Sequence, residues 1–454
     1  MRNMTLSELL QPLAAKLLGV DQAFTGVSTD SRSVRAGDLF VALRGDNFDG
    51  HDYALQVQSD GAAAALVTVP VAGTLPQLQV ANTLQALGQL GAYNRQLFSG
   101  PLVAITGSSG KTTVKNMVYA VLSQRGETLA TEGNFNNEIG VPLTLLRLRP
   151  GVEFAVVEMG AAKAGDIDCL CEMARPTVAL LLNAMPAHLQ GFGSIDGVAA
   201  AKGEIFDRLG TSDLAVINAD QPWAKAWRKR AGAASVIDFG VQQPAAISAR
   251  DVQSRGAEGV SFTVSTPVGD MAMRLNLPGV HNVSNALAAV AVGMACDVGL
   301  TDIRDGLESL QPVGGRLRSL RSSQGAVVID DCYNANPGSV RAAIDVLAAC
   351  SGRRTLVLGA MRELGENSSE MHREIGAYAR AAGIDQLWGV GPELEVCVNA
   401  FGASGRYFED RAVALVALER RFGEGDTVLI KGSRGAGMEQ LLHVLLPELT
   451  AGGH

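Results

Sequence analysis

Residues 106–113, Thr-Gly-Ser-Ser-Gly-Lys-Thr-Thr, combine the residue types that bind the phosphates of a nucleotide. The glycines allow a tight turn whose backbone N–H groups can point at phosphate oxygens. Lys111 supplies a mobile cation for the terminal phosphates, and the Thr112 hydroxyl is the expected ligand of Mg²⁺. An ordinary Gly-Ser turn before a helix is the alternative. We predict a phosphate-binding loop made of Gly107, Ser108, Ser109, Gly110, Lys111, Thr112 and Thr113.

The segments on either side of this loop help to decide between the two interpretations. The apolar residues 103–105 predict a strand, and the apolar residues at 117, 118, 121 and 122 have helical spacing. The general motif G-x-x-x-x-G-K-[ST] would place a glycine where the chain has Ile105, so the match is to a shorter G-x-x-G-K-T form. A strand, a glycine-rich turn and a helix together favour nucleotide binding.

Two further candidates follow predicted strands. Glu158 comes directly after the apolar run 154–157, and His188 lies a few residues after the run 178–182. Ligands of parallel sheets bind beyond the carboxyl ends of the strands, so both side chains would face the metal and the terminal phosphate if these strands neighbour the phosphate-loop strand. The alternatives are a helix-capping or ion-paired carboxylate for Glu158 and a hydrogen-bonded structural histidine for His188.

Lys202 remains undecided on residue spacing alone. It lies among alanines in the predicted helix 197–206. A lysine in such a helix is more often a surface residue or an ion-pair partner, here of Glu204 or Asp207. A similar ambiguity applies to Asn282, which follows a Pro-Gly turn at the start of an alanine-rich helix and could either contact a nucleotide base or cap that helix.

The order of predicted strands and helices indicates an α/β protein of three domains. Residues 1–98 are predicted to form a small mixed α/β domain. Residues 99–312 contain the phosphate loop in a central domain, whose apolar runs predict a parallel sheet with helices on both faces. Residues 313–454 are predicted to form a Rossmann-like, doubly wound domain, and a Pro-Val-Gly-Gly linker precedes Arg316.

Polar segments follow several predicted strands of the last domain. They are residues 330–337, 359–365 and 431–439. Carboxylate, amide and basic groups gathered on one sheet edge suit a cap that closes over nucleotide and substrate by a hinge motion. Polar turns of a separately folded domain are the alternative for any one of these segments.

Composition excludes some classes of partner. The chain has 454 residues, 38 Lys and Arg against 46 Asp and Glu, and a formal net charge of -8, which argues against nucleic acid or an anionic membrane. The N-terminus lacks the apolar core of a signal peptide, and no stretch reaches membrane-spanning length without polar breaks. We therefore expect a cytoplasmic protein with no membrane insertion, whose six cysteines are reduced thiols.

Taken together, the motifs resemble those of the ATP-dependent Mur ligase family of peptidoglycan precursor synthesis. The resemblance covers all three predicted domains and rests on residues 106–113, Glu158-Met-Gly160, 277–285, Gly315-Arg316 and 331–337. Within the family, residues 131–143, 187–194 and 201–206 are most similar to the members that add D-alanyl-D-alanine.

This resemblance implies a specific activity. ATP would phosphorylate the terminal carboxylate of UDP-N-acetylmuramoyl-tripeptide, and the amine of D-alanyl-D-alanine would attack the acyl phosphate to give the UDP-linked pentapeptide. It also implies two Mg²⁺ sites, and that carbon dioxide carbamoylates Lys202, converting it to a carboxylate-like ligand of the second ion. The implied catalytic and metal residues are Lys111, Thr112, Glu158, His188 and carbamoylated Lys202.

The resemblance also implies binding residues for the two nucleotides. Asn282 and Asn285 would lie near ATP, with Arg316 at the phosphates and Asp331 at the ribose. Ser31 and Arg32 would contact the uridine nucleotide, although an arginine beside a serine is usually solvated surface. Asn134, Asn136 and Asn137 would line the substrate cleft.

Two alternative functions remain. One is a sister ligase that adds a single amino acid to a shorter UDP-linked peptide, or an analogous folate or cyanophycin ligase. The other is a nucleotide-dependent scaffold or switch without ligase activity, which Lys111, Thr112, Glu158 and Lys202 weigh against because a scaffold need not keep a metal-binding set. We expect the chain to act as a monomer.

Overall fold

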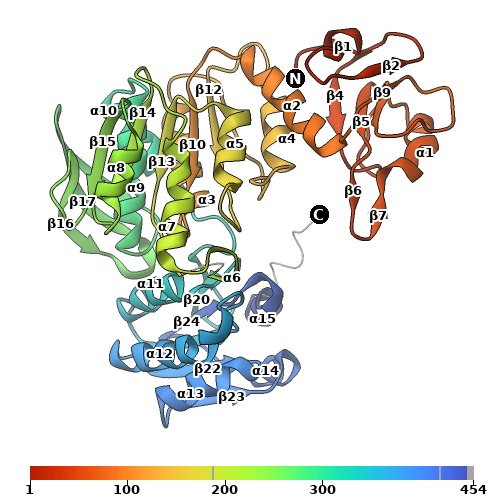
Figure 1. Cartoon of the computed structure of the whole chain (residues 1–454). Helices are drawn as coiled ribbons and strands as arrows, with labels where there is room; N and C mark the ends of the chain where they lie inside the picture. The colour runs from red at the N-terminus through yellow and green to blue at the C-terminus, as the bar shows by residue number, and fades with distance from the viewer. Residues whose placement is uncertain (187–188, 419–420, 447–454) are drawn as a thin grey trace.

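The computed structural model describes residues 1–186, 189–418 and 421–446, which build three main sheets (Figure 1). The first sheet has five strands in the order β2 (Lys16–Leu18), β9 (Gln77–Gln79), β8 (Ala64–Val67), β5 (Asp38–Val41) and β4 (Gly26–Ser28). It is joined by the short strands β1 (Met4–Thr5), β3 (Ala23–Phe24), β6 (Arg44–Gly45) and β7 (Phe48–Asp49) and by the helices α1 (Ala54–Ser59) and α2 (Thr83–Gln96). Strand β5 is buried along its whole length because apolar residues cover both of its faces.

The second sheet carries the phosphate loop and has nine strands. Their order is β11 (Thr128–Ala130), β12 (Phe154–Glu158), β10 (Leu102–Thr106), β13 (Val178–Leu181), β14 (Leu214–Asn218), β15 (Ser235–Gly240), β16 (Ile247–Ser254), β17 (Val260–Thr266) and β18 (Gly269–Leu275). Strands β12 and β13 both pair with β10 in parallel. The carboxyl ends of these three strands therefore lie side by side, which is the arrangement that placing Glu158 at the phosphate loop requires.

Helices cover both faces of this sheet because side chains of each buried strand alternate between them. Val103 and Ile105 of β10 pack with α3 (Lys111–Leu122), α9 (His281–Ala295) and α10 (Leu300–Glu308). Leu102 and Ala104 of the same strand pack on the opposite face. The helices on that face are α4 (Gly140–Leu146), α5 (Asp166–Ala174), α7 (Ile195–Gly203) and α8 (Ala224–Arg230), while the short helix α6 (Leu189–Phe192) precedes α7.

One edge of this sheet differs from the all-parallel prediction. Strands β16, β17 and β18 pair antiparallel, and Pro267 and Val268 alone separate β17 from β18. The sequence contains the signal for this hairpin, since apolar residues alternate at 260, 262 and 264 and again at 271, 273 and 275. Alternation of this kind is typical of a sheet with one covered face.

The third sheet has six strands and the architecture of a doubly wound domain. The order is β19 (Arg318–Arg321), β20 (Val327–Asp331), β24 (Asp426–Lys431), β21 (Arg353–Gly359), β22 (Gln386–Val390) and β23 (Gly405–Phe408), with only β19 antiparallel to its neighbour. Its helices are α11 (Pro337–Ala348), α12 (Ser368–Ala381), α13 (Glu395–Phe401), α14 (Arg411–Leu418) and α15 (Glu439–Leu445). The predicted α/β class is confirmed.

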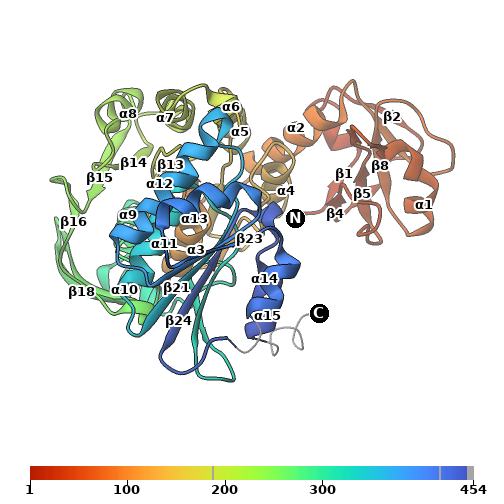
Figure 2. The same cartoon turned by 90° about the horizontal axis from the view of Figure 1, so that it is seen from below.

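Helix α2 joins the first sheet to the second. The Asn94 amide donates to the carbonyl oxygens of Leu145 (2.8 Å) and Leu148 (3.0 Å), and Arg95 Nε donates to the carbonyl of Ala174 (2.7 Å). Both side chains are buried, so these bonds fix the helix where water cannot compete. Seen from below, the first sheet lies to one side of the other two (Figure 2).

No helix within the described ranges is long and apolar enough to cross a membrane. All six cysteines are free thiols, and they are Cys169, Cys171, Cys296, Cys332, Cys350 and Cys397.

Candidate active site

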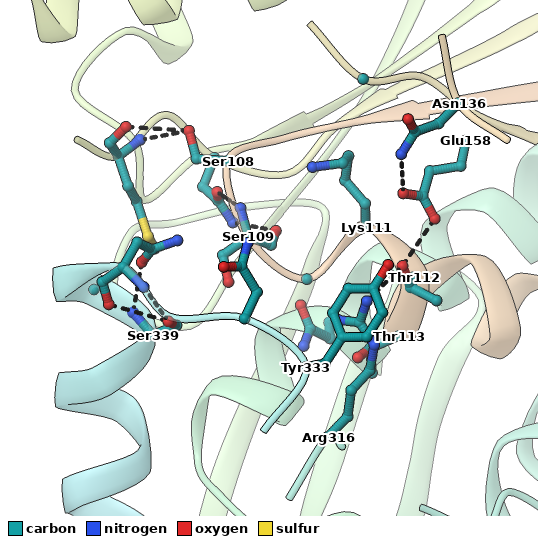
Figure 3. A pocket seen from close by; sticks show the side chains of 18 of the residues that line it. Ser108, Ser109, Lys111, Thr112, Thr113, Asn136, Glu158, Arg316, Tyr333 and Ser339 are labelled. Carbon is teal, nitrogen blue, oxygen red and sulfur yellow. Dashed lines mark hydrogen bonds between the residues drawn. The ribbon is translucent and has the colours of Figure 1, made fainter. Parts of the chain in front are cut away.

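The phosphate loop lies on the wall of a cavity of about 1140 Å³ shared by the second and third sheets. Its walls include Lys111, Thr112 and Glu158 from the central sheet and Arg316 and Asp331 from the C-terminal part of the chain. Figure 3 shows Arg316 beside Thr112 at the loop, with Glu158 on the other side of Thr112. Residues from distant parts of the sequence thus converge on the predicted phosphate site.

Backbone conformation explains the glycine that opens α3. Gly110 is the N-cap of this helix and has φ of 83°, a left-handed conformation that side chains other than glycine rarely adopt. A Cβ atom there would come 2.9 Å from Oδ1 of Asn285. Glycine therefore lets the start of α9 approach the loop and leaves the N–H groups at the start of α3 available for an anion.

Asn183 fixes the shape of the loop, a role that the sequence analysis did not assign. Its Oδ1 accepts from the backbone N–H of Ser109 (3.0 Å), and its Nδ2 donates to the Ser109 carbonyl (3.1 Å). The Ser108 hydroxyl bonds both the N–H and the carbonyl of Met185 (Figure 3). Asn183 lies two residues after β13 ends, and this position beyond the carboxyl end of a parallel strand is the signal that could have identified it.

Glu158 is held by polar contacts from several elements. Its Oε2 accepts from the Thr112 hydroxyl and its Oε1 from the Asn136 amide, both at 2.9 Å. Its backbone N–H donates to Oγ1 of Thr131 (3.0 Å), and the residue is 2% exposed. A hydroxyl and a carboxylate thus lie together beside Lys111, as the metal interpretation requires.

Lys111 folds back onto the loop. Its ammonium donates to the carbonyl oxygen of Gly107 (2.8 Å). Burial lowers the pKa of Lys111, while the charge of Glu158 opposes that shift and Arg316 adds to it. An anionic phosphate placed between these cations would favour their charged forms.

Arg316 connects the C-terminal part of the chain to the loop. Its guanidinium donates to the Thr112 hydroxyl (2.9 Å) and lies 4.2 Å from the centre of the Tyr333 ring. The linker that carries it is fixed by two bonds from its backbone, Gly315 N–H to Asp330 (2.6 Å) and Leu317 N–H to Asp331 (3.3 Å).

Asp331 forms a buried ion pair that the sequence analysis did not predict. Lys431, at the end of the neighbouring strand β24, donates to Asp331 Oδ2 (2.6 Å) and to the carbonyl of Asn334 (2.8 Å). Burial raises the pKa of Asp331, and the ammonium of Lys431 opposes that shift. The pair fixes the carboxylate at the cavity wall, where both residues are found.

Lys202 is buried, which contradicts the surface interpretation. It is 2% exposed, lines the cavity and lies 5.9 Å from the centre of the Phe192 ring. Burial, together with the charge of Lys111, lowers the pKa of Lys202 to about 7. Among the described residues it makes no ion pair, so the ion-pair interpretation is also wrong there.

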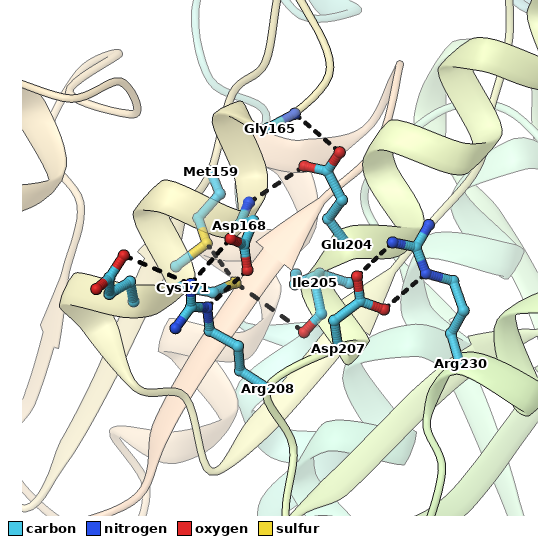
Figure 4. Close-up of polar contacts among 10 residues, drawn as sticks. Met159, Gly165, Asp168, Cys171, Glu204, Ile205, Asp207, Arg208 and Arg230 are labelled. Atoms are coloured by element: carbon cyan, nitrogen blue, oxygen red, sulfur yellow. Dashed lines mark hydrogen bonds and ion pairs between the residues drawn. The ribbon is translucent and has the colours of Figure 1, made fainter.

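The two acids considered as its partners fix the end of α7 instead (Figure 4). Glu204 accepts from the backbone N–H groups of Gly165 (2.9 Å) and Asp168 (3.2 Å) at the start of α5. Asp207 accepts from the Arg230 guanidinium at the end of α8. These contacts hold α7 against its neighbours and so keep Lys202 at the cavity.

The remaining predicted residues divide into three groups. Asn134, Asn136, Asn137, Asn282 and Asn285 line the cavity, and Asn137 also accepts from the Gly140 N–H at the start of α4 (2.9 Å). Ser31 and Arg32 do not line it, and Arg32 forms an exposed ion pair with Asp30 (2.6 Å). His188 lies outside the described residues.

The amides at the start of α9 bond within the protein. Asn282 Nδ2 donates to the Pro278 carbonyl (2.7 Å), and Asn285 Nδ2 donates to Asn282 Oδ1 (2.9 Å). These contacts fix the turn that leads into the helix. They also leave Oδ1 of Asn285 beside Gly110, at the edge of the phosphate loop.

Family models match nearly all of this architecture. The Mur ligase family catalytic domain model matches residues 23–95, the Mur ligase middle domain model matches 105–293, and the Mur ligase glutamate ligase domain model matches 315–434. An Escherichia coli protein named UDP-N-acetylmuramoyl-tripeptide--D-alanyl-D-alanine ligase is 43% identical over 98% of this chain and 99% of its own length. The chain belongs to the Mur ligase family.

Solved structures of Mur ligases have the same fold. A crystal structure of MurF from Acinetobacter baumannii aligns with a TM-score of 0.93 and 35% identity, covering 98% of this chain and 99% of that one. MurF ligase from Thermotoga maritima, in complex with ADP, aligns with a TM-score of 0.83 and 30% identity over 94% of this chain and 98% of that one. The family predicted from the motifs is confirmed.

Proposed function

We propose that this chain is the ATP-dependent ligase that joins D-alanyl-D-alanine to UDP-N-acetylmuramoyl-tripeptide. The observation that carries the proposal is the cavity in which Arg316 of the C-terminal part contacts Thr112 of the phosphate loop, in a chain whose E. coli relative bears that activity in its name. The ADP complex of the Thermotoga relative supports the binding of an adenine nucleotide by this chain.

The residues present fit Mg²⁺. The described part of the chain contains no cluster of three or more His, Cys, Asp or Glu side chains that would hold a metal alone. Mg²⁺ bound with nucleotides, however, takes one or two protein oxygens together with phosphate oxygens. Thr112 and Glu158 would supply those protein oxygens. The ion would neutralise charge that builds up on the transferring phosphoryl group.

The first step places a carboxylate at the phosphate loop. Lys111 and the N–H groups at the start of α3 hold the terminal phosphate of ATP and stabilise charge as the bond to ADP breaks. Arg316 would move from Thr112 to the phosphates. An oxygen of the tripeptide carboxylate forms the new bond to phosphorus, which yields an acyl phosphate and ADP.

The second step forms the peptide bond. The amine of D-alanyl-D-alanine attacks the acyl carbon and loses a proton, and phosphate leaves with the former carboxylate oxygen. Asn134, Asn136 and Asp331 line the cavity; we propose that the two asparagines contact the peptide and that Asp331 binds the ribose of ATP. Asn282 and Asn285 would contact the same nucleotide.

We further propose that Lys202 is carbamoylated and binds a second Mg²⁺, with His188 near that ion. An amine must be unprotonated to react with carbon dioxide, and burial gives Lys202 a pKa of about 7, so neutral amine is present at neutral pH. The carbamate would also convert an ammonium with no acid partner among the described residues into an anion facing Lys111.

We also propose the domain boundaries and the uridine-binding residues. Residues 1–98, 99–312 and 313–454 would be the three domains, and Ser31 and Arg32 would contact the uridine nucleotide in the first. A cytoplasmic location and a monomeric state stay predictions.

A substrate panel tests the function. Phosphate release and product mass are measured with ATP, UDP-N-acetylmuramoyl-tripeptide and either D-alanyl-D-alanine or single amino acids. We expect turnover only with D-alanyl-D-alanine. The product should be heavier than the UDP-linked tripeptide by the mass of the dipeptide less one water. Turnover with a single amino acid alone would support the sister-ligase alternative, and no ligation by a folded, nucleotide-binding protein would support a scaffold.

A further inference from the structure

Lys115 is a buried cation for which the proposed mechanism gives no role. It follows Lys111 by one turn of α3, so the two side chains leave the same face of the helix. Lys115 is 6% exposed, but it lies behind the cavity wall and does not line the cavity itself. A lysine is rarely buried to this extent without a partner that justifies its charge.

The contacts of Lys115 lead to the candidate metal ligand. Its ammonium donates to the carbonyl oxygen of Thr131 (2.7 Å), which is its one hydrogen-bond partner in the described ranges. The hydroxyl of the same threonine accepts from the backbone N–H of Glu158 (3.0 Å). Thr131 is 2% exposed, so this chain of contacts is closed to water.

The carboxylate of Glu158 also compensates the charge of Lys115. Burial lowers its pKa, and the carboxylate of Glu158 is the largest influence that opposes this shift. A buried ammonium with one carbonyl partner is costly unless an anion lies nearby. Glu158 is that anion, so cation and carboxylate stabilise each other across Thr131.

Thr131 also begins the segment 131–139, which lines the cavity with three asparagines. Asn136 of this segment donates to Oε1 of Glu158 (2.9 Å; Figure 3), and its carbonyl accepts from the Gly160 N–H (2.7 Å). The segment is thus attached to Glu158 at Thr131 and again at Asn136. Lys115 holds the first of these attachments.

We propose that Lys115 is a positioning residue that aligns Glu158 and the segment 131–139. This alignment would hold the metal-bound nucleotide and the UDP-linked peptide in the relative orientation that the reaction needs. The identity of that peptide rests on the proposed function. The role of Lys115 is indirect, because its ammonium reaches neither the cavity nor the reacting atoms. Residues that orient a metal ligand typically change metal affinity by about 10- to 100-fold when they are removed.

Calorimetry with a non-hydrolysable ATP analogue tests this role with and without Mg²⁺. Lys115→Met retains most of the unbranched side chain and removes its ammonium group, and Lys225→Met makes the same change at an exposed site on α8. We expect all three proteins to bind the Mg²⁺-free analogue alike. With Mg²⁺, Lys115→Met should bind on the order of 10-fold more weakly than wild type, while Lys225→Met should match wild type.

Two further variants distinguish positioning from general damage. Lys115→Arg retains the charge and should recover most of the Mg²⁺-dependent affinity. Thr131→Val removes the hydroxyl that accepts from Glu158 and should weaken Mg²⁺-dependent binding as Lys115→Met does. The double variant should lose less than the sum of the single losses, because both act through one contact chain.

The steady-state parameters supply a second readout. In Lys115→Met, kcat should fall and KM for the UDP-linked peptide should rise. The reason is that the segment 131–139 loses the contact between Lys115 and Thr131. If Lys115→Met and Lys225→Met bind the ATP analogue with equal affinity in the presence of Mg²⁺, the proposal is overturned. If Lys115→Met does not fold, Thr131→Val decides the question by the same calorimetric comparison.

The two proposals can fail separately. A wild-type protein that does not ligate D-alanyl-D-alanine would contradict the proposed function, whereas the calorimetric comparison of the Lys115 variants needs no turnover and would still stand.

Discussion

At the scale of single residues, Glu158 has the most closely fixed side chain of the site. Contacts from Thr112 and Asn136 occupy its two carboxylate oxygens, and Thr131 holds its backbone. A carboxylate fixed in this way needs little rearrangement to become a metal ligand, which is the property expected of a preorganised site.

Replacing Glu158 with glutamine tests whether its charge is used. Glu158→Gln keeps the shape of the side chain and removes the anion, so we expect kcat to fall on the order of 100-fold or more with the fold retained. The fall should be partly relieved by high Mg²⁺ concentrations. Glu172→Gln, an exposed carboxylate on α5, is the control. A Glu158→Gln enzyme with wild-type kcat would exclude a metal-binding role.

Lys202 gives a second prediction at this scale. Lys202→Ala should lose nearly all activity, and short carboxylic acids such as formate or acetate should restore part of it by replacing the carbamate. The measurement is the initial rate against carboxylic acid concentration, with Lys225→Ala treated identically. Unchanged activity in Lys202→Ala would show that Lys202 is not catalytic, and loss without rescue would contradict the carbamate.

Strand-end residues were predictable at this scale, and the buried lysines were not. Glu158 is the last residue of β12, which pairs with the phosphate-loop strand, so its position follows from the topology of parallel sheets. The burial of Lys202 and Lys115 depends on which helices pack over them, and residue spacing along one helix does not contain that information.

At the scale of elements, the turn into α3 depends on Gly110. Gly110→Ala would place a Cβ 2.9 Å from Asn285 Oδ1 in a backbone conformation with φ of 83°. We expect nucleotide affinity to fall on the order of 10-fold or more. The left-handed backbone strain costs about 1–2 kcal/mol, and the clash with Asn285 adds to this cost. Calorimetric titration with ADP measures it.

Gly165 provides the matched control for that variant. It is the N-cap of α5 with φ of 88°, and a Cβ there would meet no atom within 4 Å. Gly165→Ala therefore carries the same backbone strain without the clash and should retain nucleotide binding. Equal loss of ADP affinity in both variants would show that general strain, rather than the approach of Asn285, explains the effect.

The segment after β21 gives a pH prediction at the same scale. His372 on α12 is fully buried, its Nε2 accepts from the Met361 N–H (3.0 Å), and its Nδ1 bonds the Ser368 carbonyl (2.8 Å). Burial lowers the pKa of His372 below its ordinary value of 6.5. Below that pH the unfolded chain takes up a proton that the folded chain does not, so stability falls as pH falls.

Urea unfolding at several pH values checks this prediction. The free energy of unfolding of wild type should decrease as pH is lowered below 6.5, and this decrease should be smaller in His372→Asn. At neutral pH the variant should be the less stable protein because it loses packing and a bond to Met361. Identical pH dependence in the two proteins would mean that His372 titrates alike in the folded and unfolded chains.

Element order was largely predictable, because apolar runs and glycine turns set it locally. The strands that begin at Phe154 and Val178 start where the apolar runs predict. The antiparallel extension β16–β18 was not predicted, since it depends on recognising apolar alternation within an otherwise parallel pattern. The attachment of helix α2 to the central domain through Asn94 and Arg95 follows only from tertiary packing.

At the scale of the whole molecule, the site depends on residues that are far apart in sequence. The contact between Arg316 and Thr112 spans 204 positions, and Lys431 reaches Asp331 over 100. Motif analysis assigned Arg316 to phosphates through family resemblance, but only the fold shows which loop residue it contacts. We therefore infer that both phosphorylation and amide formation take place in the same cavity, which the two sheets share.

Following oxygen through the reaction tests this claim most directly. The UDP-linked tripeptide is prepared with heavy oxygen in its terminal carboxylate and incubated with ATP, Mg²⁺ and D-alanyl-D-alanine. The mechanism predicts that one labelled oxygen from each carboxylate appears in the released phosphate and that the other stays in the new peptide bond, as mass spectrometry would show. Released phosphate without label, despite formation of the pentapeptide, would contradict an acyl-phosphate route through this cavity.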